Sequence, residues 1–280
     1  MKWVGDWPIE TRLFRKRIGW LWCVTILLGL EFGLLVLGAV NAQAQPLATP
    51  RQISQAQRSY QEGLDRYTAK DYKGAIPLFQ RALELESTLD DAESHLAWSY
   101  YHIGEYTEAT RHFRQTLMRQ PKWEGLYDGL GWSRYQVKRY QLALDAFQQA
   151  LALDPRYRDA AVGFAYCLFE LGRYAEVLPQ LERLARDGEG GGPPNPAADV
   201  EQVRSRYAWT LFYLGDYAKA REQFTKVLST RPDWAGIHNG LGWTQLRLGD
   251  RVRAQESFRR ALQLQPDFAD AKDGLGLAGP

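Results

Sequence analysis

An alanine returns every 34 residues in this chain, always at the same place in a repeating block. Ala75, Ala109 and Ala143 are followed by Val177 in the same register, and Ala220 and Ala254 come later. A fixed period of this length is typical of stacked helical hairpins, because a single hairpin can bury its apolar face only against a neighbour. The period therefore predicts an all-α solenoid.

Other residues keep a constant distance from this alanine. Phenylalanine or leucine stands four positions after it, tyrosine stands three positions before it in most units, and proline follows twelve positions after it in four units. Residues four apart lie on one face of a helix, and proline stops a helix. Each unit is therefore predicted to be a helix, a short turn, a second helix and a break.

The third unit shows the pattern most fully, in Gly131, Tyr140, Ala143, Phe147 and Pro155. In these positions the chain resembles the tetratricopeptide repeat family, and the resemblance covers roughly residues 56–278. It implies a right-handed superhelical solenoid of helix-turn-helix hairpins whose concave face holds ligands. It implies no particular partner, because one fold can host many functions.

The repeat period also sets the expected domain boundaries. The hairpins are predicted at residues 56–89, 90–123, 124–157, 158–187, 201–234 and 235–268, with a capping helix at 269–278. Residues 45–55 are predicted to be a linker. Residues 188–200 form a Gly- and Pro-rich insertion, which is predicted to be a loop on the rim of the stack.

The first 44 residues do not share the repeat. Basic residues precede an apolar run from Ile18 to Val40, and small residues follow up to Ala44. This order is typical of a cleaved signal peptide or a retained membrane anchor, and Glu31 within the run disfavours a span without excluding it. For a signal peptide and for an anchor alike, the basic residues before the apolar run stay in the cytoplasm. The repeats are therefore expected to be exported across the inner membrane into the periplasm.

Charge and sequence motifs exclude several function classes. The first 44 residues hold five of the 35 basic and three of the 33 acidic residues, which leaves 30 of each sign intermixed along the repeats. Nucleic-acid binding, which needs a basic stripe, is not expected. The four histidines lack metal-ligand spacing, and no phosphate-binding loop or nucleophile elbow occurs, so we expect neither an enzyme nor a cofactor or metal.

A column of aromatic residues follows the repeat on the first helix of each hairpin. It lies about 200° around the helix from the residues expected to pack inward. In the family that the chain resembles, this face lines the concave groove. The candidate groove residues are Trp98, Tyr101, Trp132, Tyr135, Tyr166, Phe169, Trp209, Phe212 and Trp243, and the candidate groove-edge residues are Trp123, Asp128, Trp234 and Asn239. These rings either bind a ligand or fill the groove by packing on one another.

The segment from Trp123 to Trp132 recurs 111 residues later, from Trp234 to Trp243. A block of several units is therefore predicted to be duplicated. Both copies hold glycines within a helix, at 125, 129, 236 and 240, where each costs about 1 kcal/mol relative to alanine. The glycines either let a ligand approach the backbone or let two helices pack closely.

Two ligand classes suit an exported aromatic groove. The favoured one is a protein partner, held through an extended or Pro-rich peptide in envelope assembly or secretion. The alternative is a polysaccharide in export, with sugar rings on the aromatic faces and hydrogen bonds to Asp128 and Asn239. A clamp for a peptide carboxylate is disfavoured, because family members with such a clamp carry asparagine where this chain has Trp or Tyr.

Overall fold

The structure is a computed structural model that describes residues 49–188 and 200–279. Within these residues the regular structure is entirely helical, and all of the helices belong to one compact unit, Pro50–Pro280. The predicted signal or anchor segment and most of the predicted insertion loop lie outside the described residues. The first helices of the hairpins are α2 (Pro50–Thr68), α4 (Asp90–His102), α6 (Glu124–Gln136), α8 (Arg158–Glu170), α10 (Val200–Tyr213) and α12 (Ala235–Arg247).

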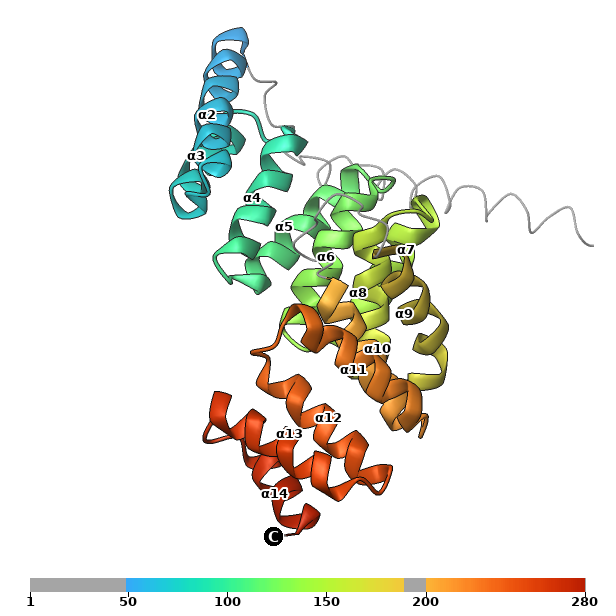
Figure 1. Cartoon of the computed structure of the whole chain (residues 1–280). Coiled ribbons are helices and arrows are strands. Elements are labelled where there is room, and N and C mark those ends of the chain that lie inside the picture. The colour runs from blue at the N-terminus through green and yellow to red at the C-terminus, as the bar shows by residue number, and fades with distance from the viewer. Residues whose placement is uncertain (1–48, 189–199, 280) are drawn as a thin grey trace, which may run out of the picture. The chain divides into compact units, whose positions relative to one another are not determined.

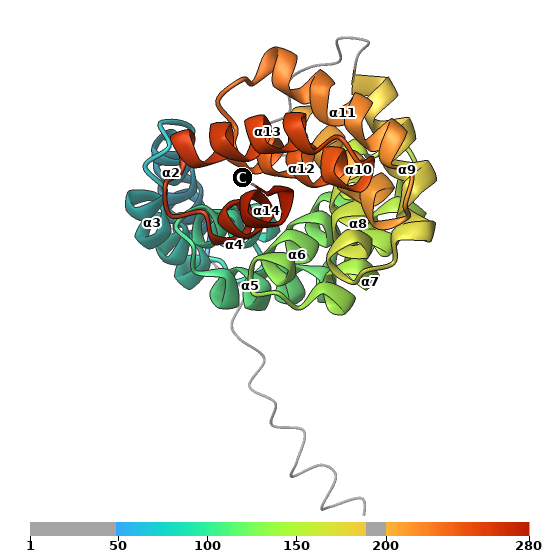
Figure 2. The same ribbon diagram turned by 60° about the horizontal axis from the view of Figure 1, so that its bottom comes forward.

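The second helices follow at a constant interval, as the repeat predicts. They are α3 (Tyr72–Leu85), α5 (Tyr106–Arg119), α7 (Tyr140–Leu153), α9 (Tyr174–Gly188), α11 (Tyr217–Thr230) and α13 (Arg251–Leu264), and α14 (Ala269–Ala278) ends the unit. Each helix packs against the next one along the chain, and each first helix also contacts the following first helix. Figure 1 shows the resulting stack, and Figure 2 shows α4, α6, α8, α10 and α12 on its inner side with the second helices outside. This is the all-α solenoid of hairpins that the period predicts.

Two boundaries differ from the sequence prediction. Helix α2 begins at Pro50, so residues 50–55 are helical and do not belong to a linker. Proline fits the first turn of a helix because its missing N–H has no partner there, and its fixed φ is already helical. The predicted loop 188–200 overlaps helices at both ends, since α9 runs to Gly188 and α10 starts at Val200.

The turn inside each hairpin needs a residue with positive φ. Gly104 takes this conformation between α4 and α5, with φ of 87°, and glycine does so at the corresponding place in three further hairpins. Lys70 and Lys138 adopt it in the remaining two described turns, with φ of 61° and 59°. The turn glycine of the repeat is therefore explained by backbone geometry, because L-residues with a side chain rarely adopt positive φ.

The core is a row of phenylalanines from the second helices, each seated against a glycine of a first helix. Phe147 of α7 is fully buried between Gly131 of α6 and Gly163 of α8. A Cβ atom added to these glycines would lie 2.6 Å and 2.3 Å from the ring. Phe258 lies between two glycines of α12 and α14 in the same way. The missing side chains thus create the space that the rings fill.

The same geometry decides between the two interpretations of the glycines in the duplicated block. A Cβ at Gly129 would lie 2.3 Å from the Phe113 ring, and one at Gly240 would lie 2.7 Å from Phe224. Close helix packing therefore accounts for these two glycines, and the approach of a ligand does not. Gly236 differs, because its nearest neighbour would be the indole nitrogen of Trp234 at 3.6 Å.

Two alanine substitutions in α12 should consequently have opposite effects. Gly240→Ala is expected to lower the free energy of unfolding by about 1–3 kcal/mol, because its methyl group overlaps the Phe224 ring. Gly236→Ala is expected to raise it by up to about 1 kcal/mol, because the methyl group fits and alanine favours the helix. Urea denaturation of both variants tests this, and equal effects would refute the packing role of Gly240.

Candidate functional site

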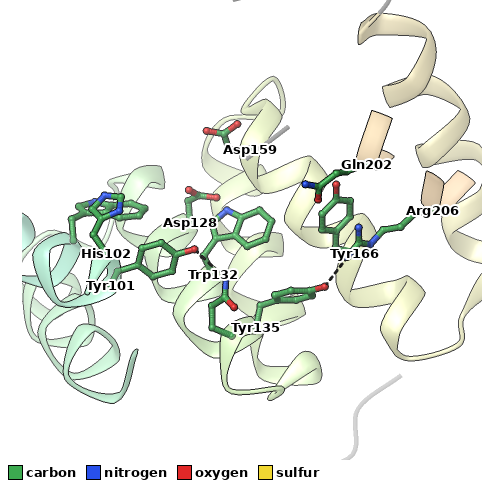
Figure 3. A pocket seen from close by; sticks show the side chains of 11 residues that line it. Tyr101, His102, Asp128, Trp132, Tyr135, Asp159, Tyr166, Gln202 and Arg206 are labelled. Atoms are coloured by element: carbon green, nitrogen blue, oxygen red, sulfur yellow. Dashed lines mark hydrogen bonds between the residues drawn. The ribbon is translucent and has the colours of Figure 1, made fainter. Parts of the chain in front are cut away.

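The candidate site is a cavity of about 570 Å³ on the inner side of the solenoid. Four successive first helices, α4, α6, α8 and α10, contribute to its wall (Figure 3). Its size lies within the range of small-ligand pockets. The residues that line it are Trp98, Tyr101, His102, Asp128, Trp132, Tyr135, Gln136, Asp159, Tyr166, Gln202 and Arg206.

Helical spacing explains why these side chains meet. On α6 the positions 128, 132 and 135 follow one another at one helical turn, and on α10 the positions 202 and 206 do the same. Each helix thus presents one face to the cavity. Because successive first helices contact one another, these faces form a continuous surface.

The structure brings together six of the predicted site residues in this cavity. They are the groove residues Trp98, Tyr101, Trp132, Tyr135 and Tyr166, and the edge residue Asp128. The other groove candidates line no part of it: Phe169, Trp209, Phe212 and Trp243. The column of rings is therefore not one uniform binding surface, and its first half alone encloses this cavity.

Each tryptophan of the column also has a packing role. The Trp98 ring stands edge-on to Phe113 at 5.1 Å between centroids, and Trp132 stands edge-on to Phe147 at 5.2 Å. Trp209 and Trp243 repeat the arrangement at 5.2 Å and 5.4 Å with the phenylalanines of their own hairpins. Edge-to-face pairs of this kind stabilise a core. Every tryptophan of the column thus packs against the core, including those beside the cavity, and this packing does not decide whether the rings also bind a ligand.

The predicted edge residues occupy three different surroundings. Trp123 is 37% exposed just before α6, and Trp234 lies in a separate hollow, with the Arg231 guanidinium 5.4 Å from its ring centroid. Asn239 is buried and donates a hydrogen bond from Nδ2 to Asp270 Oδ2 over 2.6 Å. Asp128 lines the cavity. The four residues therefore do not form one edge.

Asp128 is the most unusual group of the cavity. It is only 3% exposed, and its Oδ1 atom has no hydrogen-bond partner. Burial and the negative charge of Asp159 raise the pKa of Asp128 well above its ordinary value. The indole N–H of Trp132 lies beside the carboxylate and favours its charged form, but it does not reach hydrogen-bonding geometry (Figure 3).

The second copy of the duplicated block shows the same site with its amide and indole donors paired, although the buried Asn239 Oδ1 atom has no hydrogen-bond partner. Asn239, Trp243 and Asp270 stand 111 residues after Asp128, Trp132 and Asp159. Asn239 Nδ2 and Trp243 Nε1 both donate to Asp270 Oδ2, over 2.6 Å and 3.0 Å.

In the first copy an aspartate replaces the asparagine and cannot donate when ionised. Asp128 stands where Asn239 places its amide donor in the second copy. The carboxyl groups of Asp128 and Asp159 therefore lie at the same end of the cavity.

The other end of the cavity is built around Arg206. Its guanidinium carbon lies 3.6 Å from the centroid of the Tyr166 ring, and Nη2 donates to the Tyr135 hydroxyl over 3.2 Å. The same nitrogen is 3.6 Å from Glu170 Oε1, which accepts a hydrogen bond from Tyr135. Arg206 is thus held in place by an ion pair, a phenol and a cation–π contact.

Sequence reasoning missed five residues of the cavity wall. They are His102, Gln136, Asp159, Gln202 and Arg206. The 111-residue displacement could have revealed Asp159, since Asp270 stands at the corresponding place. His102, Gln136 and Arg206 lie next to or one turn from predicted aromatic positions, Gln202 lies two turns before Trp209, and no repeat marks any of them.

The described residues show no arrangement suited to a metal. No group of three or more His, Cys, Asp or Glu side chains in residues 49–188 and 200–279 could hold one. Cys167 is buried in the core, and burial raises the pKa of its thiol to about 12, which makes it a poor nucleophile at neutral pH. In the same part of the chain, none of the helices is long and apolar enough to cross a membrane.

Known proteins of several kinds share this fold. YrrB, described as a tetratricopeptide repeat protein with an unusual peptide-binding site, is 22% identical over 70% of this chain and 96% of its own, with a TM-score of 0.57. PilF of Pseudomonas aeruginosa is 17% identical over 79% of this chain and 97% of its own, with a TM-score of 0.63. MamA of Desulfovibrio magneticus RS-1 is 18% identical over 64% and 97%, with a TM-score of 0.56. At these identities the likeness shows the fold.

Comparison with curated protein sequences found no match. Two sequence models of the tetratricopeptide repeat match the chain, one over residues 66–130 and 135–190 and the other over residues 207–267 and 239–279. The matches reach every hairpin described above, although most of α2 and the start of α10 lie outside them. This chain therefore belongs to the tetratricopeptide repeat family.

Proposed function

We propose that this chain is a non-enzymatic interaction scaffold that binds a peptide segment of a partner protein in the cavity between α4 and α10. The observation that carries the proposal is the cavity itself, which four successive first helices line with aromatic and hydrogen-bonding side chains. Its length along the stack suits a chain-like ligand that contacts one repeat after another. The fold it shares with YrrB, a protein described by its peptide-binding site, is consistent with this use.

A peptide suits this cavity better than a polysaccharide. A sugar ring needs a broad exposed aromatic face, but Trp132 is 8% exposed and Tyr166 is 4% exposed. Both rings pack against neighbouring rings in edge-to-face pairs, at centroid distances of 5.2 Å from Trp132 to Phe147 and 6.1 Å from Trp132 to Tyr166. A peptide side chain can instead enter between the ring edges.

The compartment that we propose is based on the N-terminal sequence. The basic flank and apolar run of residues 1–44 favour export of the repeats, and we place the scaffold in the periplasm, either anchored or released. Its partner would then take part in envelope assembly or secretion.

Site-specific photo-crosslinking in living cells tests the scaffold function. A photoreactive phenylalanine at Gln202, on the cavity wall, is expected to join the chain to one linear segment of an exported protein. The control position is Met118 on the outer helix α5, where the side chain is 86% exposed and should yield no such product. Mass spectrometry of the adducts identifies the segment. Adducts spread over unrelated sequences, or a partner confined to the cytoplasm, would contradict the proposal.

A further inference from the structure

The acidic end of the cavity has an acceptor that the fold leaves unused. Asp128 is 3% exposed, and neither its Oδ1 atom nor the neighbouring Trp132 Nε1 has a hydrogen-bond partner. Leaving a buried polar atom unpaired is costly. A ligand that donates hydrogen bonds to Asp128 would remove this cost.

The fold itself does not require an acid at this place. Asn239 occupies the equivalent position in the second copy of the block and donates from its amide Nδ2 to Asp270, while its Oδ1 atom is unpaired like that of Asp128. The two copies therefore differ in the donor and in the acidity of the group, not in the unpaired oxygen. Both copies keep the tryptophan and the second aspartate. The asparagine-to-aspartate difference therefore replaces an amide donor by a carboxyl group that lines the cavity and whose ionisation is disfavoured by burial and by Asp159.

The cations and histidine of the cavity do not neutralise this charge. Arg206 is engaged at the other end by Glu170 and Tyr135. Burial lowers the pKa of His102, so its imidazole is uncharged at neutral pH. No ion pair reaches Asp128 from any of the described residues.

The walls between the two ends suit a cation. Trp98, Tyr101, Trp132 and Tyr135 line the cavity. Figure 3 shows Tyr101 and Trp132 near Asp128, and Tyr135 toward Arg206. Aromatic rings attract a cation placed over their faces or held among them. The fold already uses another ring of the cavity wall in that way, because the Arg206 guanidinium lies 3.6 Å from the Tyr166 centroid.

From this geometry we infer that the cavity binds a lysine or arginine side chain of the partner, with its charged end at Asp128 and its methylene groups among the aromatic rings. The inference rests on the proposed peptide-binding function and names the side chain that the peptide must carry. The positive group donates to the unpaired Asp128 oxygen and stabilises the ionised carboxylate that burial and Asp159 disfavour. The ion pair forms away from bulk water, where its attraction is poorly screened.

Short peptides with blocked ends provide the test. We would titrate the purified full chain with acetyl-Gly-Gly-X-Gly-Gly-amide, where X is lysine, arginine, norleucine or glutamate, and follow tryptophan fluorescence. Lysine and arginine peptides are expected to bind at least about tenfold more tightly than norleucine, which has a similar apolar stem without the charge. Glutamate should bind more weakly than norleucine.

Asp128→Asn is the decisive variant, because Asn239 shows that asparagine is compatible with the fold at this place. It should reduce the preference for lysine over norleucine to below about threefold. The control variant is Asp145→Asn, which removes an exposed carboxylate from the outer helix α7 and should leave the preference unchanged.

Three outcomes would overturn the inference. Equal binding of lysine and norleucine peptides excludes the cation site but leaves peptide binding intact. If no peptide binds, the cation site is excluded. The scaffold function is then still tested separately, by the crosslinks from Gln202. Binding of maltoheptaose without binding of peptides would favour the polysaccharide alternative over both.

Discussion

Replacing Phe147 with alanine is expected to lower the free energy of unfolding by about 3–5 kcal/mol. The ring is fully buried, and it fills the space between Gly131 on α6 and Gly163 on α8. Neither glycine has a side chain that could move into the cavity left by the ring. Because each hairpin of a solenoid is stabilised mainly by its neighbours, the loss should weaken both interfaces of this unit. Urea denaturation followed by circular dichroism measures the change.

A second substitution shows whether the contact with glycine is responsible. Gly163→Ala alone should destabilise the chain, because the added Cβ would lie 2.3 Å from the Phe147 ring. With alanine at position 147 the same methyl group has room and partly fills the cavity, so Gly163→Ala should then be stabilising. This change of sign is the coupling that a double-mutant cycle detects. Equal effects of Gly163→Ala in both backgrounds would refute the ring-on-glycine packing.

The repeat architecture could be predicted from the sequence because spacing alone determines it. A residue four positions after Ala143 must lie on the same helix face, so Phe147 could be placed in the core before any contact was known. Gly163 shows the limit of this reasoning. The helix that contains Gly163 was predictable. The Phe147 ring that occupies the space beside Gly163 belongs to the preceding hairpin, and this contact is known only from the distance between the two helices.

The candidate site could be predicted less completely than the fold, because spacing fixes the helix face of a residue but not its function. Spacing correctly placed Trp132 and Tyr135 on one helix face, but it could not separate binding from packing, because Trp132 does both. One edge of its ring packs on Phe147, and the ring also lines the cavity. Arg206 was missed because it belongs to no repeated position, and because the tertiary contact with Tyr166 joins helices α8 and α10.

The charge at position 128 should affect stability in the direction opposite to its effect on binding. At pH 7 Asp128→Asn is expected to raise the free energy of unfolding by about 1–3 kcal/mol, the usual cost of a buried polar group without a partner. Folding raises the pKa of Asp128 above the ordinary value of about 4, so the folded chain binds more protons than the unfolded chain between these two pKa values. The stability of the natural chain attributable to Asp128 therefore falls as the pH rises through this interval. The gain from Asp128→Asn should be small near pH 4 and should increase toward pH 7.

The neighbouring titratable groups do not alter the sign of this difference. Asp159 is present in both proteins, and its negative charge is the reason that a second carboxylate is disfavoured. The tyrosines near Asp128 have raised pKa values and stay neutral over this pH range. The charged and titratable groups that face Asp128 from the elements packed around it are Asp159 and Tyr157 at the start of α8, Tyr101 and His102 on α4, and Arg206 on α10.

The reciprocal substitution in the second copy of the block should have the opposite effect. Asn239→Asp removes the 2.6 Å hydrogen bond from Nδ2 to Asp270 and places two carboxylates in contact, so it is expected to lower the free energy of unfolding by about 2–3 kcal/mol at pH 7. The loss should diminish toward pH 4, where the new carboxyl group can be protonated and can donate again. Thermal denaturation of both variants from pH 4 to pH 8 measures the two slopes. Slopes of the same sign would show that the acid at 128 is satisfied within the fold. Opposite slopes would mean that ionised Asp128 destabilises the natural chain, as a binding site for a cation requires.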